Sequence, residues 1–490
     1  MVLLAGLAAV LVAAGVVGSV RAGDGLVRTT TVVDGVPLTL VRLGSSGPAR
    51  QPGAVVVHGF AGSARLMQPF ADTLARNGYV VALPDLAGHG ASTRALVDPM
   101  SDVDVAVRFL RARSDVDADH IVLVGHSRGA AAVTAYAGVH DDIAATVALS
   151  LGQAPAVQPR NLLMLYGQFE FPVLAAAAQE MLLRPDPTAT VTMGYTYGSA
   201  ADGTARRADP VPGVEHVSIL FSATAHERTL TWLDAAVEPG RTQPDVHPVD
   251  RLWPAMVLLL GLLVGFLPVT ALVFLGTPSG VGSVAPVDLA RLALVLAGGL
   301  AAGAVAGLVT PDPVLGMAVG GYTAIVLLAF GGATAIGARL VHAPATQAQH
   351  NHRWTYLRTA LLAVYATAMV AVPIQVGLTW VVPSGPRLGP LVAILAAAWV
   401  LFVAAEWLSG GRWYLHAAVL AAPLVLLLAL VIVGFGPGFL VLVLPLLGAL
   451  LAVGAGVAAV LRRWSVAPWL AAAVAAPPFA WTVAATLPLA

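Results

Sequence analysis

The stretch that decides the fold is Ile121-Val122-Leu123-Val124-Gly125-His126-Ser127-Arg128-Gly129-Ala130-Ala131-Ala132. Apolar residues typical of a buried strand run directly into a G-x-S-x-G pentad, and three alanines that favour a helix follow. In this context the two glycines let the turn tighten and hold the serine hydroxyl clear of the sheet. The amides of the following helix also point at the site, where they stabilise negative charge. The stretch predicts a sharp strand-to-helix turn that presents Ser127 as a nucleophile.

An upstream apolar strand ends in a second candidate element of the site. Val55-Val56-Val57 is followed by His58-Gly59-Phe60, and Ala61-Gly62-Ser63 then leads into a predicted helix. Attack on a carbonyl needs two N–H donors for the developing oxyanion, and one such donor typically lowers the barrier by about 3 kcal/mol. We expect the backbone N–H groups of Phe60 and Arg128 to form this oxyanion hole. His58 is interpreted as a structural loop residue rather than a catalytic base.

A serine nucleophile also needs a base and an acid, which in this architecture follow the serine in the order acid, then histidine. Residues 162–166 form an apolar strand, and Glu170 lies just beyond its carboxyl end, where active sites of open α/β sheets belong. His216, in Val214-Glu215-His216-Val217-Ser218, is the predicted general base and acid. The alternative for Glu170 is an ordinary surface glutamate.

Three other histidines are weaker candidates for the base. His226 lies inside a predicted helix, His120 begins a strand, and His89 belongs to the loop Pro84-Asp85-Leu86-Ala87-Gly88-His89-Gly90 that more often shapes a pocket. These histidines lack the spacing of metal ligands, so no metal site and no cofactor are expected.

The surrounding residues 26–235 alternate between short β-rich runs and helix-length segments, which is typical of a mostly parallel α/β sheet. A hairpin with an Asp34-Gly35 turn opens the region. The predicted strands are residues 27–33, 38–43, 54–57, 79–83, 121–124, 144–149 and 162–166, and the predicted helices lie near 64–77, 103–113 and 128–139.

Taken in order, these motifs resemble those of the α/β-hydrolase superfamily. The resemblance implies a serine hydrolase with Ser127, Glu170 and His216 as catalytic triad, acting on an ester, thioester or amide, but it does not identify the substrate. Two features depart from the common pattern. The acid is glutamate rather than aspartate, and residues 150–160 leave almost no room for the lid domain that many relatives carry.

The remainder of the 490 residues cannot belong to a soluble globule. The chain is 58% hydrophobic and 11% charged, with a mean hydropathy of +0.82, whereas soluble domains are about 25% charged. A net charge of zero gives no polybasic surface for nucleic acid. Cysteine is absent, which excludes disulfides and a cysteine nucleophile.

We therefore predict an α/β-hydrolase domain joined to an all-α polytopic membrane domain. The boundaries are an N-terminal transmembrane anchor or signal peptide at 1–22, the hydrolase domain at 23–236, a proline-containing linker at 237–252 and a membrane domain at 253–490. An uncleaved anchor is favoured because Arg21 falls inside the best cleavage triplet. About eight spans are expected, at residues 254–276, 289–308, 314–340, 357–382, 388–407, 413–433, 439–460 and 466–487.

Charged residues in alternate loops predict the topology. The basic loops hold Arg339, Arg353, Arg358, His342, His350 and His352 after the third span, Arg412 after the fifth, and Arg462 and Arg463 after the seventh. By the positive-inside tendency these loops are cytoplasmic and the hydrolase domain is extracytoplasmic, with Arg387 as the exception. Glu406, near a span end, is expected to reach the interface or to pair with Arg412.

The function expected from these features is a membrane-bound serine hydrolase in the cell membrane that cleaves an ester, with a lipid or acyl ester as the candidate, through an acyl-Ser127 intermediate. The expected partners are a small-molecule or lipid acyl substrate and membrane lipids, without nucleic acid, and the oligomeric state is open. The alternatives are an acyltransferase with the same triad, a transporter or flippase with an accessory hydrolase-like domain, and a pseudo-hydrolase used for binding.

Overall fold

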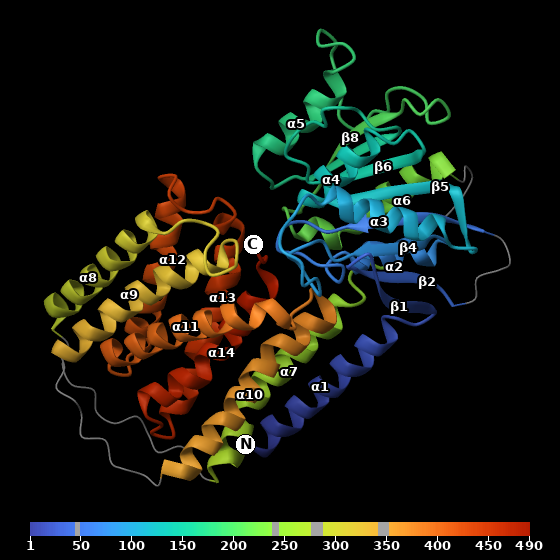
Figure 1. The fold of residues 1–490 in the computed structure, drawn as a ribbon. Helices are drawn as coiled ribbons and strands as arrows, with labels where there is room; N and C mark the ends of the chain where they lie inside the picture. Colours follow the sequence, from blue (N-terminus) through green and yellow to red (C-terminus); the bar gives the residue numbers. More distant parts are fainter. Residues whose placement is uncertain (45–49, 238–244, 276–287, 342–351) are drawn as a thin grey trace. The chain divides into compact units, whose positions relative to one another are not determined.

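The computed structural model describes residues 1–44, 50–237, 245–275, 288–341 and 352–490 (Figure 1). The chain divides into two compact units. The α/β unit comprises Val17–Pro254 and the short segment Val376–Trp380, and the helical unit comprises Met1–Val16, Ala255–Gln375 and Val381–Ala490. Residues 238–244 of the expected linker, together with His342 and His350 of the basic loop after the third span, lie outside the described residues.

The α/β unit is built on one eight-stranded sheet with the order β1-β2-β4-β3-β5-β6-β7-β8. The first three strands in this order pair antiparallel, and every later pairing is parallel. The strands are β1 Leu26–Val33, β2 Val36–Leu43, β3 Gln51–Val57, β4 Val80–Pro84, β5 Val116–His126, β6 Ile143–Leu149, β7 Leu162–Gly167 and β8 Arg206–Val211. The predicted mostly parallel α/β class is confirmed.

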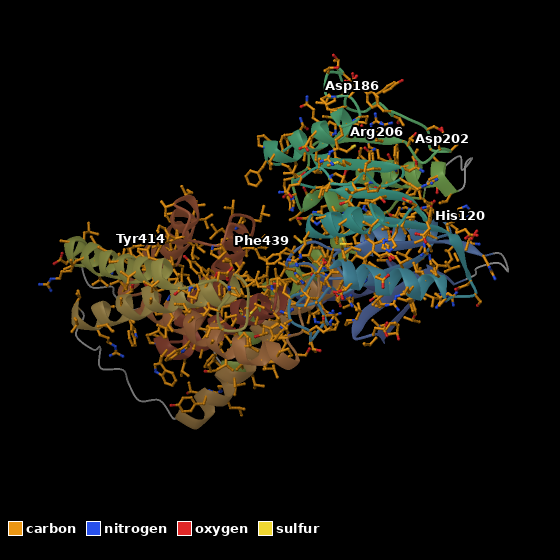
Figure 2. The ribbon with its side chains drawn as sticks, turned by 45° about the horizontal axis from the view of Figure 1, so that its top comes forward. His120, Asp186, Asp202, Arg206, Tyr414 and Phe439 are labelled. Carbon is orange, nitrogen blue, oxygen red and sulfur yellow. The ribbon has the colours of Figure 1, made fainter. Side chains whose placement is uncertain are left out.

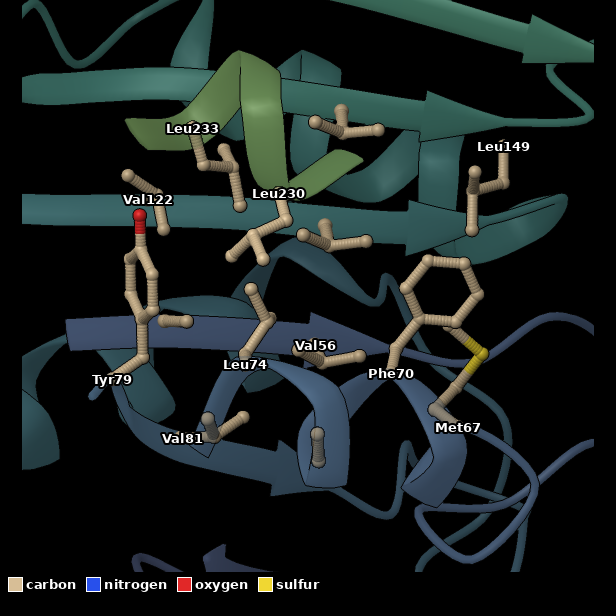
Figure 3. Packing of buried hydrophobic residues seen from close by; sticks show 14 of the residues in the cluster. Val56, Met67, Phe70, Leu74, Tyr79, Val81, Val122, Leu149, Leu230 and Leu233 are labelled. Atoms are coloured by element: carbon tan, nitrogen blue, oxygen red, sulfur yellow. The ribbon is translucent and has the colours of Figure 1, made fainter. Parts of the chain in front are cut away.

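Side-chain alternation along the central strands provides two apolar faces, each covered by helices. The helices are α2 Gln68–Arg76, α3 Met100–Arg111, α4 Arg128–Ala137, α5 Pro172–Leu183 and α6 Ala223–Val237. Val56 points toward α2 and α6, and packs with buried Phe70 and Leu230 in the cluster drawn in Figure 3. Its neighbours Val55 and Val57 point to the opposite face, which α3 and α4 cover. Burial on both faces explains why β3 is an unbroken apolar run.

The sequence analysis missed β8 and α5. The β8 sequence is Arg-Arg-Ala-Asp-Pro-Val, which lacks the apolar run of a central strand. It lies at the edge of the sheet, where a single pairing with β7 suffices and proline is tolerated. Arg206 projects from this edge (Figure 2), with its guanidinium 5.8 Å from the ring centroid of Tyr197.

The described part of the helical unit contains the expected long apolar helices. They are α7 Leu252–Phe274, α8 Leu289–Val309, α9 Gly320–Val341, α10 His352–Gly377, α11 Leu388–Ser409, α12 Trp413–Ile432, α13 Leu440–Arg462 and α14 Pro468–Thr486, and the N-terminal α1 spans Val2–Arg21. Counting α1, nine described helices are long and apolar enough to cross a membrane. The chain is therefore a multi-pass membrane protein.

Small residues let these helices approach closely, as is common in membrane bundles. A Cβ added at Gly15 of α1 would lie 2.7 Å from the Cβ of Leu258 on α7, and one at Gly331 of α9 would lie 3.0 Å from the Cα of Leu401 on α11. Gly15 and Gly331 therefore have a packing function.

Two charged residues in the spans have partners that the sequence did not reveal. The Arg387 side chain is 1% exposed and donates to the carbonyls of Ala484 and Leu487 at the end of α14, at 2.9 and 2.7 Å. A helix C-terminus stabilises a cation, which accounts for an arginine that departs from the charge pattern of the loops. Glu406 pairs with Arg462 of α13 rather than with the expected Arg412.

Candidate active site

The pentad forms a strained turn between β5 and α4. Ser127 follows the last residue of β5 and has φ of +53° and ψ of −116°, a backbone conformation that is unfavourable for a residue with a side chain. A Cβ at Gly125 would lie 2.3 Å from the carbonyl oxygen of Gly129, and one at Gly129 would lie 2.4 Å from the carbonyl oxygen of Val57. Both pentad positions therefore require glycine, as the motif predicts.

The structure brings Ser127, His216 and Glu170 together although they are far apart in sequence. The distance from His216 Nε2 to Ser127 Oγ is 3.0 Å, and the distance from His216 Nδ1 to Glu170 Oε1 is 2.6 Å. The Glu170 side chain is 1% exposed, and its other oxygen accepts the backbone N–H of Gly167 at 2.6 Å. A carboxylate held this way fixes the imidazole so that Nδ1 donates to it and Nε2 faces the hydroxyl.

Each partner of Ser127 comes from a loop at the carboxyl edge of the sheet. Glu170 follows β7 by three residues, between that strand and α5. His216 lies between β8 and the 3-10 turn Ser218–Phe221. The adjacent Glu215 accepts the N–H groups of Val217 and Ser218, which lower the pKa of its carboxyl and stabilise the turn.

The loop after β3 lies directly beside Ser127. We call residues 59–63 the oxyanion loop, since Phe60 is one of the two expected oxyanion donors. A Cβ at Gly59 would lie 3.0 Å from the Cβ of Ser127, which is tighter than an ordinary contact, so glycine favours this approach. Arg128, the other expected donor, is the first residue of α4, and its guanidinium lies 5.9 Å from the Phe60 ring centroid.

His58 and Asp85 fix this loop from behind. His58 is fully buried, with Nδ1 2.8 Å from the carbonyl oxygen of Gly59, and its Nε2 accepts the N–H of Leu86 at 3.1 Å. Burial lowers the pKa of His58, so the ring is neutral and joins two loops. Asp85 accepts the N–H groups of Ala64 and Ala91 at 2.7 and 3.0 Å.

The three histidines considered as weaker candidates for the base have other partners. His120 projects from the surface of the α/β unit (Figure 2), in the first half of β5, and pairs with Asp117 at 2.8 Å. His226 is buried in α6 against Thr73, with Nδ1 2.7 Å from its Oγ1. His89 is buried with Nδ1 2.9 Å from the carbonyl oxygen of Ala87, and its ring centroid is 5.2 Å from that of His58.

His126 is a residue of the site that the sequence analysis gave no role. Its Nε2 lies 2.8 Å from the carbonyl oxygen of His216, and the two ring centroids are 4.9 Å apart. Burial, followed by the nearby His216, lowers the pKa of His126 to about 3. The neutral ring therefore donates its Nε2–H to that carbonyl and holds the loop that carries the base. The only sequence signal was a histidine at the second pentad position.

We expect His126→Phe to lower kcat for ester hydrolysis by about ten-fold, because the His216 loop loses its tether and misplaced catalytic groups react slowly. His126→Gln, which keeps an N–H donor, should recover part of the loss. Because the ring of His126 is already neutral above about pH 3, neither change should move the acid limb of the pH profile. Wild-type kcat in His126→Phe at pH 5 to 9 would contradict this role.

Exposed apolar residues neighbour Glu170 and His216 in the sequence. Phe169 and Phe171, on either side of Glu170, are 69% and 56% exposed, and Val217, next to His216, is 41% exposed. The connection from β6 to β7, residues 150–161, is fully described and contains no helix or strand that would act as a lid. Apolar groups of this size near a site provide contact area for an apolar part of a ligand.

Comparisons with known proteins agree on the fold. Residues 55–177 match a family model described as alpha/beta hydrolase fold. The chain is 34% identical over 134 residues to epoxide hydrolase A of Mycobacterium tuberculosis, covering 26% of this chain and 41% of that protein. It is 31% identical over 103 residues to a thermostable monoacylglycerol lipase of a Bacillus species, covering 20% of this chain and 40% of the lipase.

Among solved structures, the chain is similar to an esterase from Thermogutta terrifontis, at 17% identity and a TM-score of 0.33, covering 44% of this chain and 96% of the esterase. The chain spans about two fifths of the length of the two curated relatives. The matched family region contains both the oxyanion loop and the pentad. The chain thus carries a domain of the α/β-hydrolase superfamily, joined to a helical membrane unit.

Proposed function

We propose that this protein is a membrane-bound serine hydrolase that cleaves a carboxylic ester with an apolar acyl group. The observation that carries the proposal is the continuous series of contacts from Ser127 Oγ through His216 to buried Glu170, at 3.0 and 2.6 Å. A hydroxyl, an imidazole and a carboxylate in this order are the components of acyl transfer to serine. The monoacylglycerol lipase among the relatives is consistent with an acyl ester as substrate.

In the first half of the reaction, Ser127 Oγ attacks the ester carbonyl carbon while His216 Nε2 takes the hydroxyl proton. The carbonyl oxygen becomes an oxyanion, which the N–H groups of Phe60 and Arg128 stabilise. When the tetrahedral intermediate collapses, the bond to the alcohol breaks and His216 protonates the leaving oxygen. Glu170 keeps its negative charge throughout and stabilises the imidazolium.

In the second half, water replaces the alcohol. His216 accepts a proton from the water while the water oxygen attacks the acyl carbon. The new oxyanion occupies the same oxyanion hole as the first. Collapse breaks the bond to Ser127, His216 returns the proton to Oγ, and the carboxylic acid leaves.

The test is turnover of p-nitrophenyl esters of increasing acyl length by the full chain in detergent micelles. Since Phe169, Phe171 and Val217 leave apolar surface exposed beside the triad, kcat/KM should rise from acetate to medium-length acyl chains. A higher kcat/KM for the acetate ester than for longer esters would reject the proposed preference for an apolar acyl group. No turnover of any ester by well-folded protein would reject the hydrolase.

We further propose that the hydrolase domain lies outside the cytoplasmic membrane, because the basic loops alternate along the spans. Arg412 and Arg463 belong to loops that this topology places inside. The chain lacks cysteine, so an introduced cysteine is a unique label. A membrane-impermeant maleimide should label Asp186→Cys, an exposed site of the α/β unit labelled in Figure 2, in intact cells. Arg463→Cys, an exposed matched site, should react only after permeabilisation, and the reverse pattern would invert the topology.

A further inference from the structure

The α/β unit includes one segment from far along the chain. Val376–Trp380 consists of the last two residues of helix α10 and the three residues that follow it, yet by its contacts it belongs with Val17–Pro254. Its first residue is held by Arg251, whose Nη2 donates to the Val376 carbonyl oxygen at 2.9 Å. A sequence position flanked by two membrane helices thus contributes to the hydrolase domain.

The other end of this segment contacts the oxyanion loop. Ser63 Oγ accepts the backbone N–H of Trp380 at 3.0 Å and lies 2.8 Å from Thr379 Oγ1. Ser63 is 1% exposed and Thr379 is 8% exposed, so these bonds are shielded from water. A buried polar group that loses its hydrogen-bond partner costs the full free energy of its desolvation. The contacts of Ser63 with Thr379 and Trp380 therefore strongly disfavour displacement of Ser63.

The oxyanion loop needs such support because its backbone is strained. Ala61 has φ of +59°, in the left-handed region that is unfavourable for a residue with a Cβ. A conformation of this kind persists only when surrounding contacts determine it. On the strand side the loop is fixed by the bond from Gly62 N–H to the Gly59 carbonyl at 3.0 Å, and on the helix side by Asp85 and by the Ser63 contacts.

We propose that the Val376–Trp380 segment holds the oxyanion loop in its reactive conformation through Ser63, which makes Thr379 and Ser63 positioning residues for hydrolysis. The inference rests on the proposed function, since Phe60 of this loop is one of the expected oxyanion donors. Neither side chain contacts the reacting atoms. Their effect is to set the direction of an N–H that must meet the oxyanion, where small displacements are costly.

The test measures three variants in the full chain in detergent micelles. Thr379→Val, which is nearly isosteric, should lower kcat by about ten-fold with KM little changed, because the alignment of one donor is impaired and total loss of such a donor costs about 100- to 1,000-fold. Ser63→Ala removes both contacts and should lower kcat further. Thr379→Ser restores the hydroxyl and should return kcat to near the wild-type value.

The matched control is Thr367→Val. Thr367 lies within α10, where its Oγ1 donates to the Ala363 carbonyl of its own helix at 2.8 Å. This variant also removes a threonine hydroxyl, but one that has no contact with the oxyanion loop. It should retain wild-type kcat. Equal losses in Thr367→Val and Thr379→Val would overturn the proposal.

A transition-state analogue separates positioning from a general structural effect. An alkyl trifluoromethyl ketone forms a tetrahedral adduct with a serine, so its affinity reports on the oxyanion hole. Across the variants its affinity should fall by the same factor as kcat/KM, while the thermal midpoint of the α/β unit remains within a few degrees. If the wild type turns over but Thr379→Val equals it in kcat and analogue affinity, the inference fails and the proposed function stands. If the wild type neither binds the analogue nor turns over, the proposed function itself fails.

Discussion

Replacing Ser127 with alanine is expected to reduce kcat for a p-nitrophenyl ester by about a million-fold. The change removes the atom that forms the covalent bond, whereas the oxyanion donors and the apolar surface remain. The residual rate reflects those donors alone. The measurement is initial-rate kinetics of the purified full chain, with wild type and variant prepared in the same detergent.

Ser101→Ala is the matched control for this variant. Ser101 is exposed on α3 and bonds the carbonyl of Asp98 at 3.0 Å, so its loss removes a hydroxyl without touching the site. It should retain wild-type turnover. If Ser127→Ala keeps more than about 1% of the wild-type rate, Ser127 is not the nucleophile, because a million-fold loss is the expected scale.

Glu170→Gln is expected to lower kcat by about 10,000-fold with KM little changed, the scale observed when a triad carboxylate becomes an amide. Both Glu170 oxygens are occupied, one by His216 Nδ1 and the other by the Gly167 N–H, each at 2.6 Å. Glutamine has one acceptor oxygen, so its amide group must face one of these two donors. If the amide faces His216, the imidazole takes the tautomer that cannot accept the serine proton.

Two further variants separate this effect from simple loss of charge. Glu227→Gln, on the exposed surface of α6, removes the same charge away from the triad and should leave kcat unchanged. Glu170→Asp keeps the carboxylate on a shorter side chain and should retain more activity than Glu170→Gln. Equal kcat in Glu170→Gln and wild type would assign Glu170 a structural role and leave the acid position to another group.

The fold was predictable where a local pattern alone determines the structure. Strands β3 and β5 are buried on both faces, so their apolar runs identify them, and the glycines of the pentad reveal the turn that follows β5. Strand β8 was missed because an edge strand needs neither an apolar run nor full hydrogen bonding. Apolar length was sufficient to find the membrane helices, since lipid requires long apolar segments.

Within the site, the sequence predicted the residues that the proposed chemistry requires but not those that support them. Ser127, Glu170 and His216 belong to motifs with a known order along the chain. The role of His126 depends on a carbonyl 90 residues away, and the Ser63–Thr379 pair spans 316 residues. No periodicity or spacing connects such positions. The same is true of Arg387, an exception to the charge pattern of the loops. Its carbonyl partners lie about 100 residues further along the chain, so the sequence did not reveal them.

The central claim is that Ser127 is the nucleophile of a working triad, and fluorophosphonate labelling tests it most directly. The purified full chain would be treated with the probe, followed by intact-mass measurement and peptide mapping of wild type, Ser127→Ala and His216→Ala. We expect one adduct on Ser127 in the wild type, none in Ser127→Ala and strongly slowed labelling in His216→Ala, because the imidazole activates the hydroxyl. Failure of the well-folded wild type to react, or labelling that persists in Ser127→Ala, would contradict the account.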